Sequence, residues 1–247
     1  MSAVRPSATI EVWATTDPGL ARARNEDCIG SSGWAGQGTI GLARHSYSGV
    51  EPVVCVVADG LGGLPAGDVA SLTVTRELVH GPAPADTAAL DEALLAAHRL
   101  LRDHGAADPA LAGMATTVAV LVIAAETILC ANVGDTRIYE LGGGAVEPVS
   151  FDDTPGLAAG SGELRTSVLT QALGGTKADP PRPHVQWFKR EPLGFLLCSD
   201  GLTNTVSEAE IGATLAAGED AAVLRALLGL ALDRGAPDNV SVMLVRT

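Results

Sequence analysis

Positive charge is scarce in this sequence. Its 247 residues include 16 Lys and Arg against 29 Asp and Glu, so the formal net charge at pH 7 is -13. A chain with this balance is repelled by polyanions, which argues against nucleic acid or an anionic membrane as its main partner. The excess of carboxylates favours divalent cations instead.

Long hydrophobic runs are also lacking. The longest strongly apolar stretch extends from Val118 to Ala125 and is ended by Glu126, so it is too short to cross a bilayer. The first ten residues, MSAVRPSATI, lack the apolar core of a secretory signal. We therefore expect no membrane partner.

The few cysteines form no CxxC pair and no Cys/His pair. The four residues, Cys28, Cys55, Cys130 and Cys198, are widely spaced, and three of them lie in apolar, strand-like runs. This pattern is typical of buried reduced thiols. We therefore expect a cytoplasmic protein.

Several common catalytic motifs are absent. The sequence has no GxxxxGK[ST] loop, no GxGxxG after a strand, no GxSxG elbow and no HExxH helix. Nucleotide binding and serine hydrolysis therefore lose their main support. The five histidines show no zinc-like spacing: His45, His80, His98, His104 and His184.

The length and the 47% hydrophobic content suit one large domain. No segment reads as a linker, so we expect a single domain over 8–247 and a flexible N-terminus over 1–7. Runs rich in Val, Ile and Leu predict strands at 8–14, 53–58, 117–124, 127–133, 136–141, 184–189, 194–198 and 240–246. We expect the Gly/Ser-rich stretch 30–50 to be an exposed excursion and the polar stretch 152–167 to be a loop near the functional site.

Helical periodicity occurs in two pairs of segments. The first pair is predicted near 67–80 and 87–104, and the second pair after Asp200, with a capping box from Ser207 to Glu210 and a helix over 219–234. The expected buried faces consist of Leu90, Leu94, Ala97 and Leu101 in one helix and of Val223, Leu227 and Leu230 in another. Strands in blocks and helices in pairs predict an α+β fold with layered antiparallel sheets.

Four aspartates stand in tight turns at the ends of apolar runs. They are Asp59 in VVCVVADG, Asp135 in ILCANVGD, Asp200 in FLLCSDG and Asp238 in GAPDN. Any one of them alone reads as a plain turn. If the strand tips converge at one end of a sandwich, however, the clustered carboxylates need a counter-charge, which a metal supplies.

Carboxylates, backbone carbonyls and water are the ligands that suit Mg²⁺ or Mn²⁺. Two such ions about 3.5–4 Å apart can activate a water and stabilise an in-line displacement at phosphorus. The acidic residues therefore predict hydrolysis of a phosphate ester.

Six ordered segments resemble the metal-dependent protein phosphatase 2C family, in its bacterial branch. They are DPGLARARNED (17–27), VVADGLGG (56–63), MATTVAV (114–120), NVGDTRIY (132–139), LLCSDGLTNTVS (196–207) and APDNVSVMLV (236–245). The resemblance covers about 16–246. It implies a four-layer α-β-β-α sandwich, in which two antiparallel sheets are flanked by pairs of antiparallel helices.

The resemblance also implies roles for the matched residues. Asp59 would bridge two metal ions. Glu26 and the Gly60 carbonyl would serve one of these ions, and Asp200 and Asp238 would complete the other.

Further roles follow from the same resemblance. Asp135 would share a third, weaker ion with Asp200, while Asp27 and Asn239 would hydrogen-bond metal-bound waters. Arg22 matches the arginine that holds the substrate phosphate, where a guanidinium fork can bind two oxygens.

Two features differ from the family pattern, and a pair of threonines adds little to it. Leu61 stands where animal members carry a histidine proposed as general acid, so the proton donor is unassigned and a metal-bound water is the candidate. The flap between Asp153 and 169–175 is short, which predicts altered substrate selection and a weaker third metal site. Thr116 and Thr117 could hydrogen-bond near the site, but β-propensity alone also explains two threonines at the start of a strand.

These observations predict a Mn²⁺- or Mg²⁺-dependent phosphatase of phosphoserine and phosphothreonine proteins, acting as a monomer and opposing a bacterial Ser/Thr kinase. Two alternatives stay open. One is a non-catalytic, phosphoprotein-binding regulatory domain of the same fold. The other is a phosphomonoesterase of small molecules.

Overall fold

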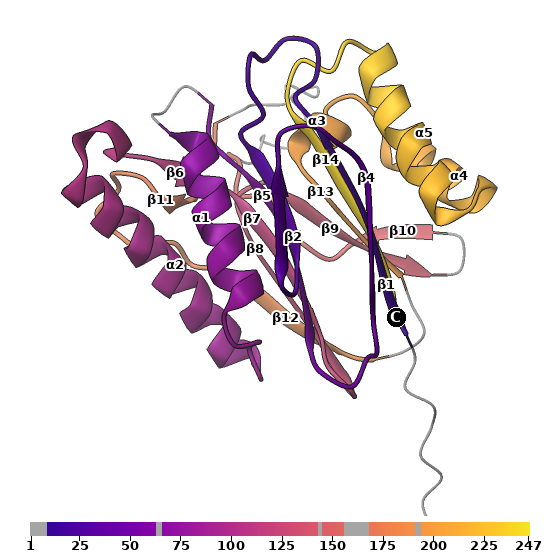
Figure 1. Cartoon of the computed structure of the whole chain (residues 1–247), viewed down its shortest axis with the longest axis horizontal. Coiled ribbons are helices and arrows are strands. Elements are labelled where there is room, and N and C mark those ends of the chain that lie inside the picture. Colours follow the sequence, from indigo (N-terminus) through magenta and orange to yellow (C-terminus); the bar gives the residue numbers. More distant parts are fainter. Residues whose placement is uncertain (1–8, 63–65, 143–144, 156–167, 191–193) are drawn as a thin grey trace, which may run out of the picture.

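The computed structural model describes residues 9–62, 66–142, 145–155, 168–190 and 194–247. Two six-stranded antiparallel sheets lie face to face in the middle of the molecule (Figure 1). The first sheet has the order β10-β9-β13-β14-β1-β4 and the second the order β12-β8-β7-β5-β2-β3. A two-stranded ladder of β6 (Ala115–Thr116) and β11 (Leu173–Gly174) adjoins the second sheet.

The strands have the following bounds. In the first sheet they are β1 (Ile10–Asp17), β4 (Ile40–Tyr47), β9 (Arg137–Gly142), β10 (Ala145–Pro148), β13 (Gly194–Cys198) and β14 (Val240–Arg246). In the second sheet they are β2 (Asp27–Ser31), β3 (Trp34–Gln37), β5 (Val53–Asp59), β7 (Val118–Ile123), β8 (Thr127–Val133) and β12 (His184–Lys189).

Helices cover the outer face of each sheet. The pair α1 (Gly67–His80) and α2 (Thr87–Ala107) packs on the second sheet, and a 3-10 turn (Pro109–Leu111) follows it. The pair α4 (Glu208–Ala217) and α5 (Asp220–Asp233) packs on the first sheet, after the short helix α3 (Asp200–Thr203). Figure 1 shows the two pairs on opposite sides of the sheets, which confirms the predicted four layers.

Three apolar layers hold the sandwich together. One lies between the sheets and includes Ile29, Val57 and Phe195, and the other two lie under the helix pairs. Strands β5 and β7 are buried on both faces, which explains why they appear in the sequence as continuous apolar runs.

The predicted helix details are largely confirmed. The Ser207 hydroxyl and the Glu210 carboxylate form the capping box of α4, and the expected faces of α2 and α5 are buried, except that Leu230 is only partly buried. The helix α2 extends three residues beyond the predicted end. The expectation for residues 1–7 and most of the flap prediction lie outside the described residues.

The prediction of an exposed excursion over 30–50 is wrong. This stretch contains the hairpin partner β3 and the edge strand β4, which pairs with β1. Trp34, Ile40 and Tyr47 pack against the layer between the sheets, so one face of each strand is partly buried. Frequent glycines, including those with positive φ at Gly33 and Gly38, hide this pattern in the sequence.

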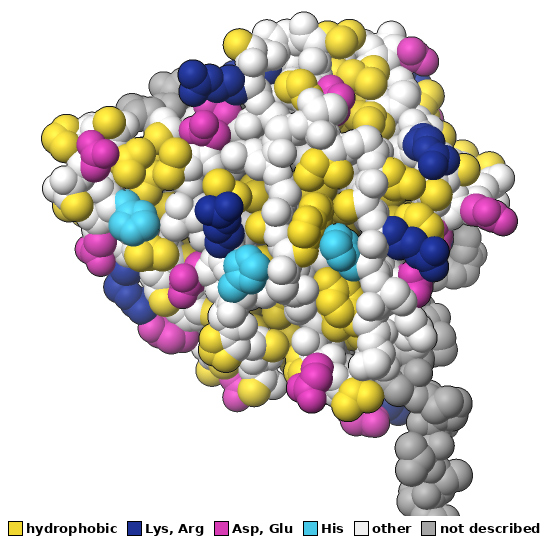
Figure 2. Space-filling model, in the orientation of Figure 1, with side chains coloured by type: hydrophobic (Ala, Val, Ile, Leu, Met, Phe, Trp, Pro, Cys, Tyr) yellow, Lys and Arg dark blue, Asp and Glu magenta, His cyan; other side chains and the backbone are white. Residues whose placement is uncertain are grey.

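The surface carries charge without a broad basic region on the face that Figure 2 shows, where Lys and Arg side chains stand apart from one another. No helix in the described part of the chain is long and apolar enough to span a membrane.

Candidate active site

Three of the predicted acidic residues meet at one end of the second sheet. Asp59 ends β5, and Asp27 lies directly opposite it as the first residue of the antiparallel strand β2. Asp135 follows β8 at the same end, because β7 and β8 pair antiparallel from Val118 and Val133 onward. The convergence of these strand tips is therefore as the sequence predicted.

The first sheet brings its aspartates to this same end. Asp200 follows β13 and Asp238 precedes β14, its antiparallel neighbour. The two sheets are joined here by hydrogen bonds: the hydroxyls of Ser199 and Ser241 both donate to Asp27 Oδ2, each at 2.7 Å.

The hydroxyl groups around Asp27 form a chain with a defined direction. An ionised carboxylate only accepts, so the single hydroxyl proton of Ser241 is committed to Asp27. Thr16 Oγ1, 2.7 Å from Ser241 Oγ, must then donate to it, and Thr16 in turn accepts from Asn25 Nδ2 at 2.7 Å. The chain therefore favours the ionised form of a carboxylate that is fully buried.

The acidic side chains raise one another's pKa. Burial, followed by repulsion from Asp27, Asp200 and other aspartates, raises the pKa of Asp59 well above its ordinary value. Burial raises the pKa of Asp27 to about 7, although the bonds from Ser241 and Ser199 oppose this, and burial with repulsion from Asp200 raises the pKa of Asp135 to about 7. These carboxylates therefore lack enough nearby positive charge to stabilise their ionised forms.

The pKa values of Asp200 and Glu26 are raised as well. Burial and then repulsion from Asp238 raise the pKa of Asp200, while the hydrogen bond from Asn204 opposes the rise. Burial and repulsion from Asp68 raise the pKa of Glu26.

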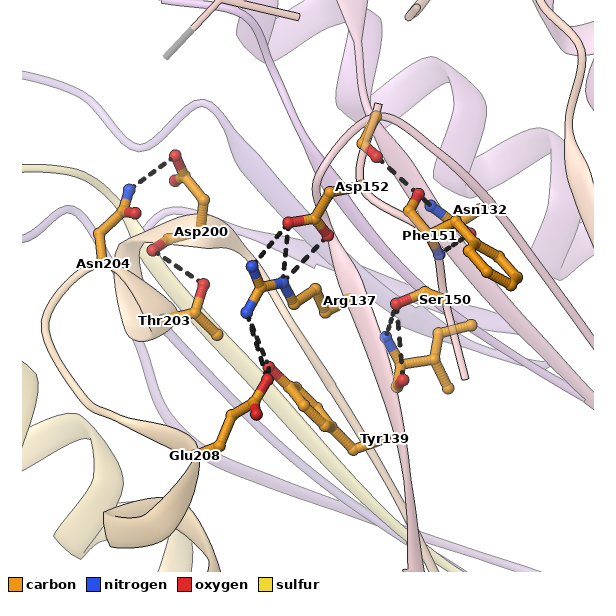
Figure 3. Close-up of polar contacts among 12 residues, drawn as sticks. Asn132, Arg137, Tyr139, Ser150, Phe151, Asp152, Asp200, Thr203, Asn204 and Glu208 are labelled. Atoms are coloured by element: carbon orange, nitrogen blue, oxygen red, sulfur yellow. Dashed lines mark hydrogen bonds and ion pairs between the residues drawn. The ribbon is translucent and has the colours of Figure 1, made fainter. Parts of the chain in front are cut away.

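Two carboxylate oxygens at this end are buried without a hydrogen-bond partner, namely Asp27 Oδ1 and Asp200 Oδ1. The second oxygen of Asp200 accepts from Asn204 Nδ2 at 2.9 Å (Figure 3). An unpaired buried oxygen is costly, and oxygen is the donor type that Mg²⁺ and Mn²⁺ prefer. The residues therefore fit a hard divalent cation.

The carboxylate oxygens are not arranged around one common metal position. Among the residues that the structure describes, no three Asp, Glu, His or Cys side chains are gathered closely enough to hold a metal ion as they stand. Asp238 instead forms an ion pair with Arg22, with 2.7 Å between Oδ2 and Nη2.

Arg22 lies among the acidic residues, as the sequence analysis expected. Its pKa is raised by Asp238 first and further by Glu26 and Asp59, so its guanidinium is near all three. A Cβ at Gly62 would come within 2.6 Å of Arg22 Nη1, so the Arg22 guanidinium lies directly against this glycine. The Arg22 side chain is 43% exposed and is therefore accessible to an anion.

The turn after Asp59 is held by backbone contacts. A Cβ at Gly60 would meet the Gly67 carbonyl oxygen at 2.2 Å, so only glycine fits. The Thr116 hydroxyl donates to the Asp59 carbonyl, and the Asp59 N–H donates to the Thr117 hydroxyl. Both threonines thus position the turn, a role that strand propensity did not indicate.

Asn239 positions the segment that carries Glu26. Its Oδ1 accepts from the Glu26 N–H at 2.8 Å, and its Nδ2 donates to the carbonyls of Pro18 and Arg24, both at 2.9 Å. These bonds use the amide to orient backbone, while its expected contact with a metal-bound water stays a prediction.

A second polar group next to the site is fully paired (Figure 3). Arg137 makes two hydrogen bonds to Asp152 Oδ2 and one to Oδ1, and it also donates to the Tyr139 hydroxyl. Glu208 lies 3.5 Å from Arg137 Nη1 and accepts from Tyr139. This group ties β9 to the loop before the flap and to the start of α4.

Sequence reasoning missed the structural partners of the aspartates. Ser199 and Ser241 adjoin predicted site residues, at one position before Asp200 and three after Asp238, and that adjacency was the available signal. Arg137 and Asp152 are 15 residues apart and have no local pattern.

Comparison with known proteins decides the family. The sequence matches the family described as Protein phosphatase 2C over residues 43–227. The serine/threonine protein phosphatase PstP of Mycobacterium tuberculosis is 30% identical over 97% of this chain. The chain belongs to the protein phosphatase 2C family.

Other members of the protein phosphatase 2C family agree. The serine/threonine phosphatase Stp of Listeria innocua is 31% identical over 79% of this chain and 84% of its own length. A crystal structure of the M. tuberculosis PstP/Ppp superposes with a TM-score of 0.79 at 30% identity, covering 97% of this chain and 99% of that chain. The family resemblance and the fold predicted from the sequence are thus confirmed.

Two further findings qualify this protein phosphatase 2C membership. This chain spans about half the length of the M. tuberculosis relatives, namely 45%. One structure of the PstP catalytic domain, with a TM-score of 0.75 and 29% identity, is described as a complex with two manganese ions. The family is metal-dependent, in agreement with the predicted chemistry.

Proposed function

We propose that this protein is a Mn²⁺- or Mg²⁺-dependent phosphatase that hydrolyses phosphoserine and phosphothreonine in proteins. The observation that carries the proposal is the meeting of Asp27, Asp59, Asp135 and Asp200 at one end of the sandwich, with raised pKa values and two unpaired buried oxygens. Family membership supports the same reaction.

The residues that would hold the ions are Asp59, Glu26, Asp200 and Asp238, together with the Gly60 carbonyl. Bound ions would supply Lewis acidity, which lowers the pKa of water and screens the negative charge of the phosphate.

A third ion at Asp135 is also part of the proposal. The residues that would hold it are Asp135 and Asp200, whose carboxylates repel each other. The relative described with two manganese ions supports two ions and leaves the third to experiment.

The remaining residues would bind and orient. Arg22 would bind the substrate phosphate with its guanidinium, exchanging its present pairing with Asp238 for the phosphate oxygens. Asn239 would hold Glu26 in place through the Glu26 backbone, and the Thr16–Ser241–Asp27 chain would favour the ionised form of Asp27 against the effect of burial. Leu61 cannot donate a proton, so the leaving group would take its proton from water.

The proposal extends to the cellular setting. The substrates would be phosphoproteins of a bacterial Ser/Thr kinase, and the protein would act in the cytoplasm as a monomer. Four buried free cysteines, whose thiol pKa values are raised by burial, are compatible with a reducing compartment.

The test is hydrolysis of a phosphothreonine peptide with Mn²⁺, with EDTA, and by the Asp59→Asn variant. We expect turnover only for the native protein with Mn²⁺, and a loss of about 10²–10³-fold or more in the variant. Calorimetric binding of Mn²⁺ provides a second readout. Mn²⁺ binding without turnover of any phosphoester would indicate a regulatory binding domain instead, and faster turnover of small metabolites would indicate a small-molecule phosphomonoesterase.

A further inference from the structure

A pocket of about 770 Å³ lies beside the candidate active site, between α2 and the segment 169–182. This volume is in the range of ligand-binding pockets. Its lining includes Leu61, two residues after Asp59, so the pocket begins within about 7 Å of the Asp59 backbone along the chain. An extended peptide advances about 3.3 Å per residue, so a side chain two to four residues from a phosphoresidue at the acidic end can reach the pocket.

The wall of the pocket is continuous with the turn that carries Asp59. Ala115 and Gly174 line the pocket and pair with each other across the ladder of β6 and β11. The Leu61 N–H donates to the Ala115 carbonyl at 3.0 Å, and Gly60 forms a bridge with Thr116. The pocket is therefore built from the same ladder that fixes the active-site turn.

A buried histidine forms another part of the wall. His98 on α2 is 6% exposed, and its Nδ1 accepts from the Gly174 N–H at 3.1 Å. In the neutral ring the proton must then be on Nε2, which leaves a hydrogen-bond donor on this wall. Burial first, and then Arg102 and Arg99, lower the pKa of His98, so two cations also contribute positive potential here.

Positive side chains outnumber negative ones in the lining of the pocket, whereas the molecule as a whole has a negative net charge. Lys177 and Arg182 line the pocket and are exposed, against a single acid, Asp179, whereas the whole chain has a net charge of -13. Within the described residues neither cation is in an ion pair, although Lys177 Nζ donates to the Thr170 carbonyl. Both charges are therefore available to a ligand.

From these observations we propose that the pocket receives a side chain of the phosphoprotein close to the phosphorylated residue, and that Lys177 and Arg182 make it prefer Glu or Asp. This inference rests on the proposed phosphatase function and adds a substrate preference to it. A cationic or neutral side chain at that position would gain nothing from the two cations.

The experiment uses phosphothreonine peptides in which Glu is placed singly at positions from four residues before to four after the phosphothreonine, each paired with its Gln analogue. The readout is the ratio of kcat/KM for the Glu and Gln peptides, which a general loss of activity does not change. We expect the native protein to show a ratio of about three to ten at one or two positions, because exposed ion pairs contribute modestly.

The variant Lys177→Glu/Arg182→Glu should bring this ratio to one or below and should favour a Lys peptide at the same position. Lys189→Glu is the matched control, because Lys189 lies on β12 opposite Thr127, at the far end of the strand from His184. It should keep the native ratio. A native ratio of one at every position, or equal effects of the double variant and the control, would overturn the proposal.

Hydrolysis of p-nitrophenyl phosphate by the native protein with Mn²⁺ tests the underlying phosphatase function separately. If that hydrolysis fails, calorimetric binding of the Glu and Gln peptides to the native protein still tests the pocket. Tighter binding of the Glu peptide that the double variant abolishes would support it, and equal binding would refute it.

Discussion

Two groups of carboxylates lie side by side at the same end of the sandwich, and the protein treats them in opposite ways. In the group of Arg137, the carboxylate of Asp152 receives three hydrogen bonds from one guanidinium (Figure 3). In the acidic group, Asp27 and Asp200 each keep one buried oxygen unpaired, and their pKa values are raised.

We expect the difference to separate residues that stabilise the fold from residues that serve the proposed function. A paired carboxylate contributes to stability, whereas unpaired clustered carboxylates cost stability and persist when another role requires them. Asp59 and Asp200 are therefore expected to be costly in the protein without divalent cations. The pair of Arg137 and Asp152 is expected to offset part of that cost nearby.

The largest expected effect comes from replacing one carboxylate in each group by its amide and comparing the two variants. Asp200→Asn should lower kcat/KM for a phosphopeptide by about 10²–10³-fold, because a proposed ligand loses its charge. The matched change Asp152→Asn should keep activity within about tenfold of native. Similar losses in both variants, measured under saturating Mn²⁺, would remove the distinction between the groups.

Stability should respond in the reverse order. Arg137→Ala leaves Asp152 without its partner, and we expect a cost of about 2 kcal/mol in the free energy of unfolding, which urea titration measures. The two side chains are 22% and 26% exposed, so the cost should be below that of a fully buried pair. Asp200→Asn in EDTA should instead leave stability unchanged or raise it.

The pH dependence of stability sharpens the contrast. The pKa values of Asp27 and Asp135 are raised to about 7 in the folded state, so the folded protein holds more protons than the unfolded chain between about pH 4 and 7. In EDTA, the contribution of these groups is fully present below about pH 4 and is lost as the pH rises through about 7. The slope should be at most about 1.4 kcal/mol per pH unit for each group.

This slope is measured by urea unfolding from pH 5 to 8. Asp135→Asn should flatten it, whereas Asp152→Asn should leave it nearly unchanged. If the stability of the native protein in EDTA rose steadily over this range, the raised pKa values of Asp27 and Asp135 would be contradicted.

The sequence allowed the acidic end to be predicted because its information is local. Apolar runs that end on Asp59 or Asp200 mark strand tips, and the alternation of strand blocks with helix pairs indicates the layers. The strands β3 and β4 escaped because their glycines interrupt any alternation, and their burial depends on contacts with the layer between the sheets.

The hydrogen-bond and ion-pair partners of the carboxylates could not be predicted from the local sequence, for a related reason. Thr16, Asn25 and Ser241 form their chain of hydrogen bonds only after β1, β2 and β14 have been brought together. The pairing of Arg22 with Asp238 joins residues 216 apart. Which charges are paired and which are not is thus a property of the fold, and it is what distinguishes the two groups.

The smallest expected effect concerns this chain of hydroxyls. Ser241→Ala removes one of the two donors to Asp27 Oδ2 and should cost about 1 kcal/mol at pH 8, where Asp27 is ionised. The cost should shrink at pH 5, since a protonated carboxyl group depends less on donors. Thr16→Val, which removes a donor to Ser241 and no contact with Asp27, should cost less and should show a weaker pH dependence. A cost of Ser241→Ala that is equal at both pH values would mean that the Ser241 hydroxyl merely fills space and that Ser199 alone supports the charge on Asp27 Oδ2.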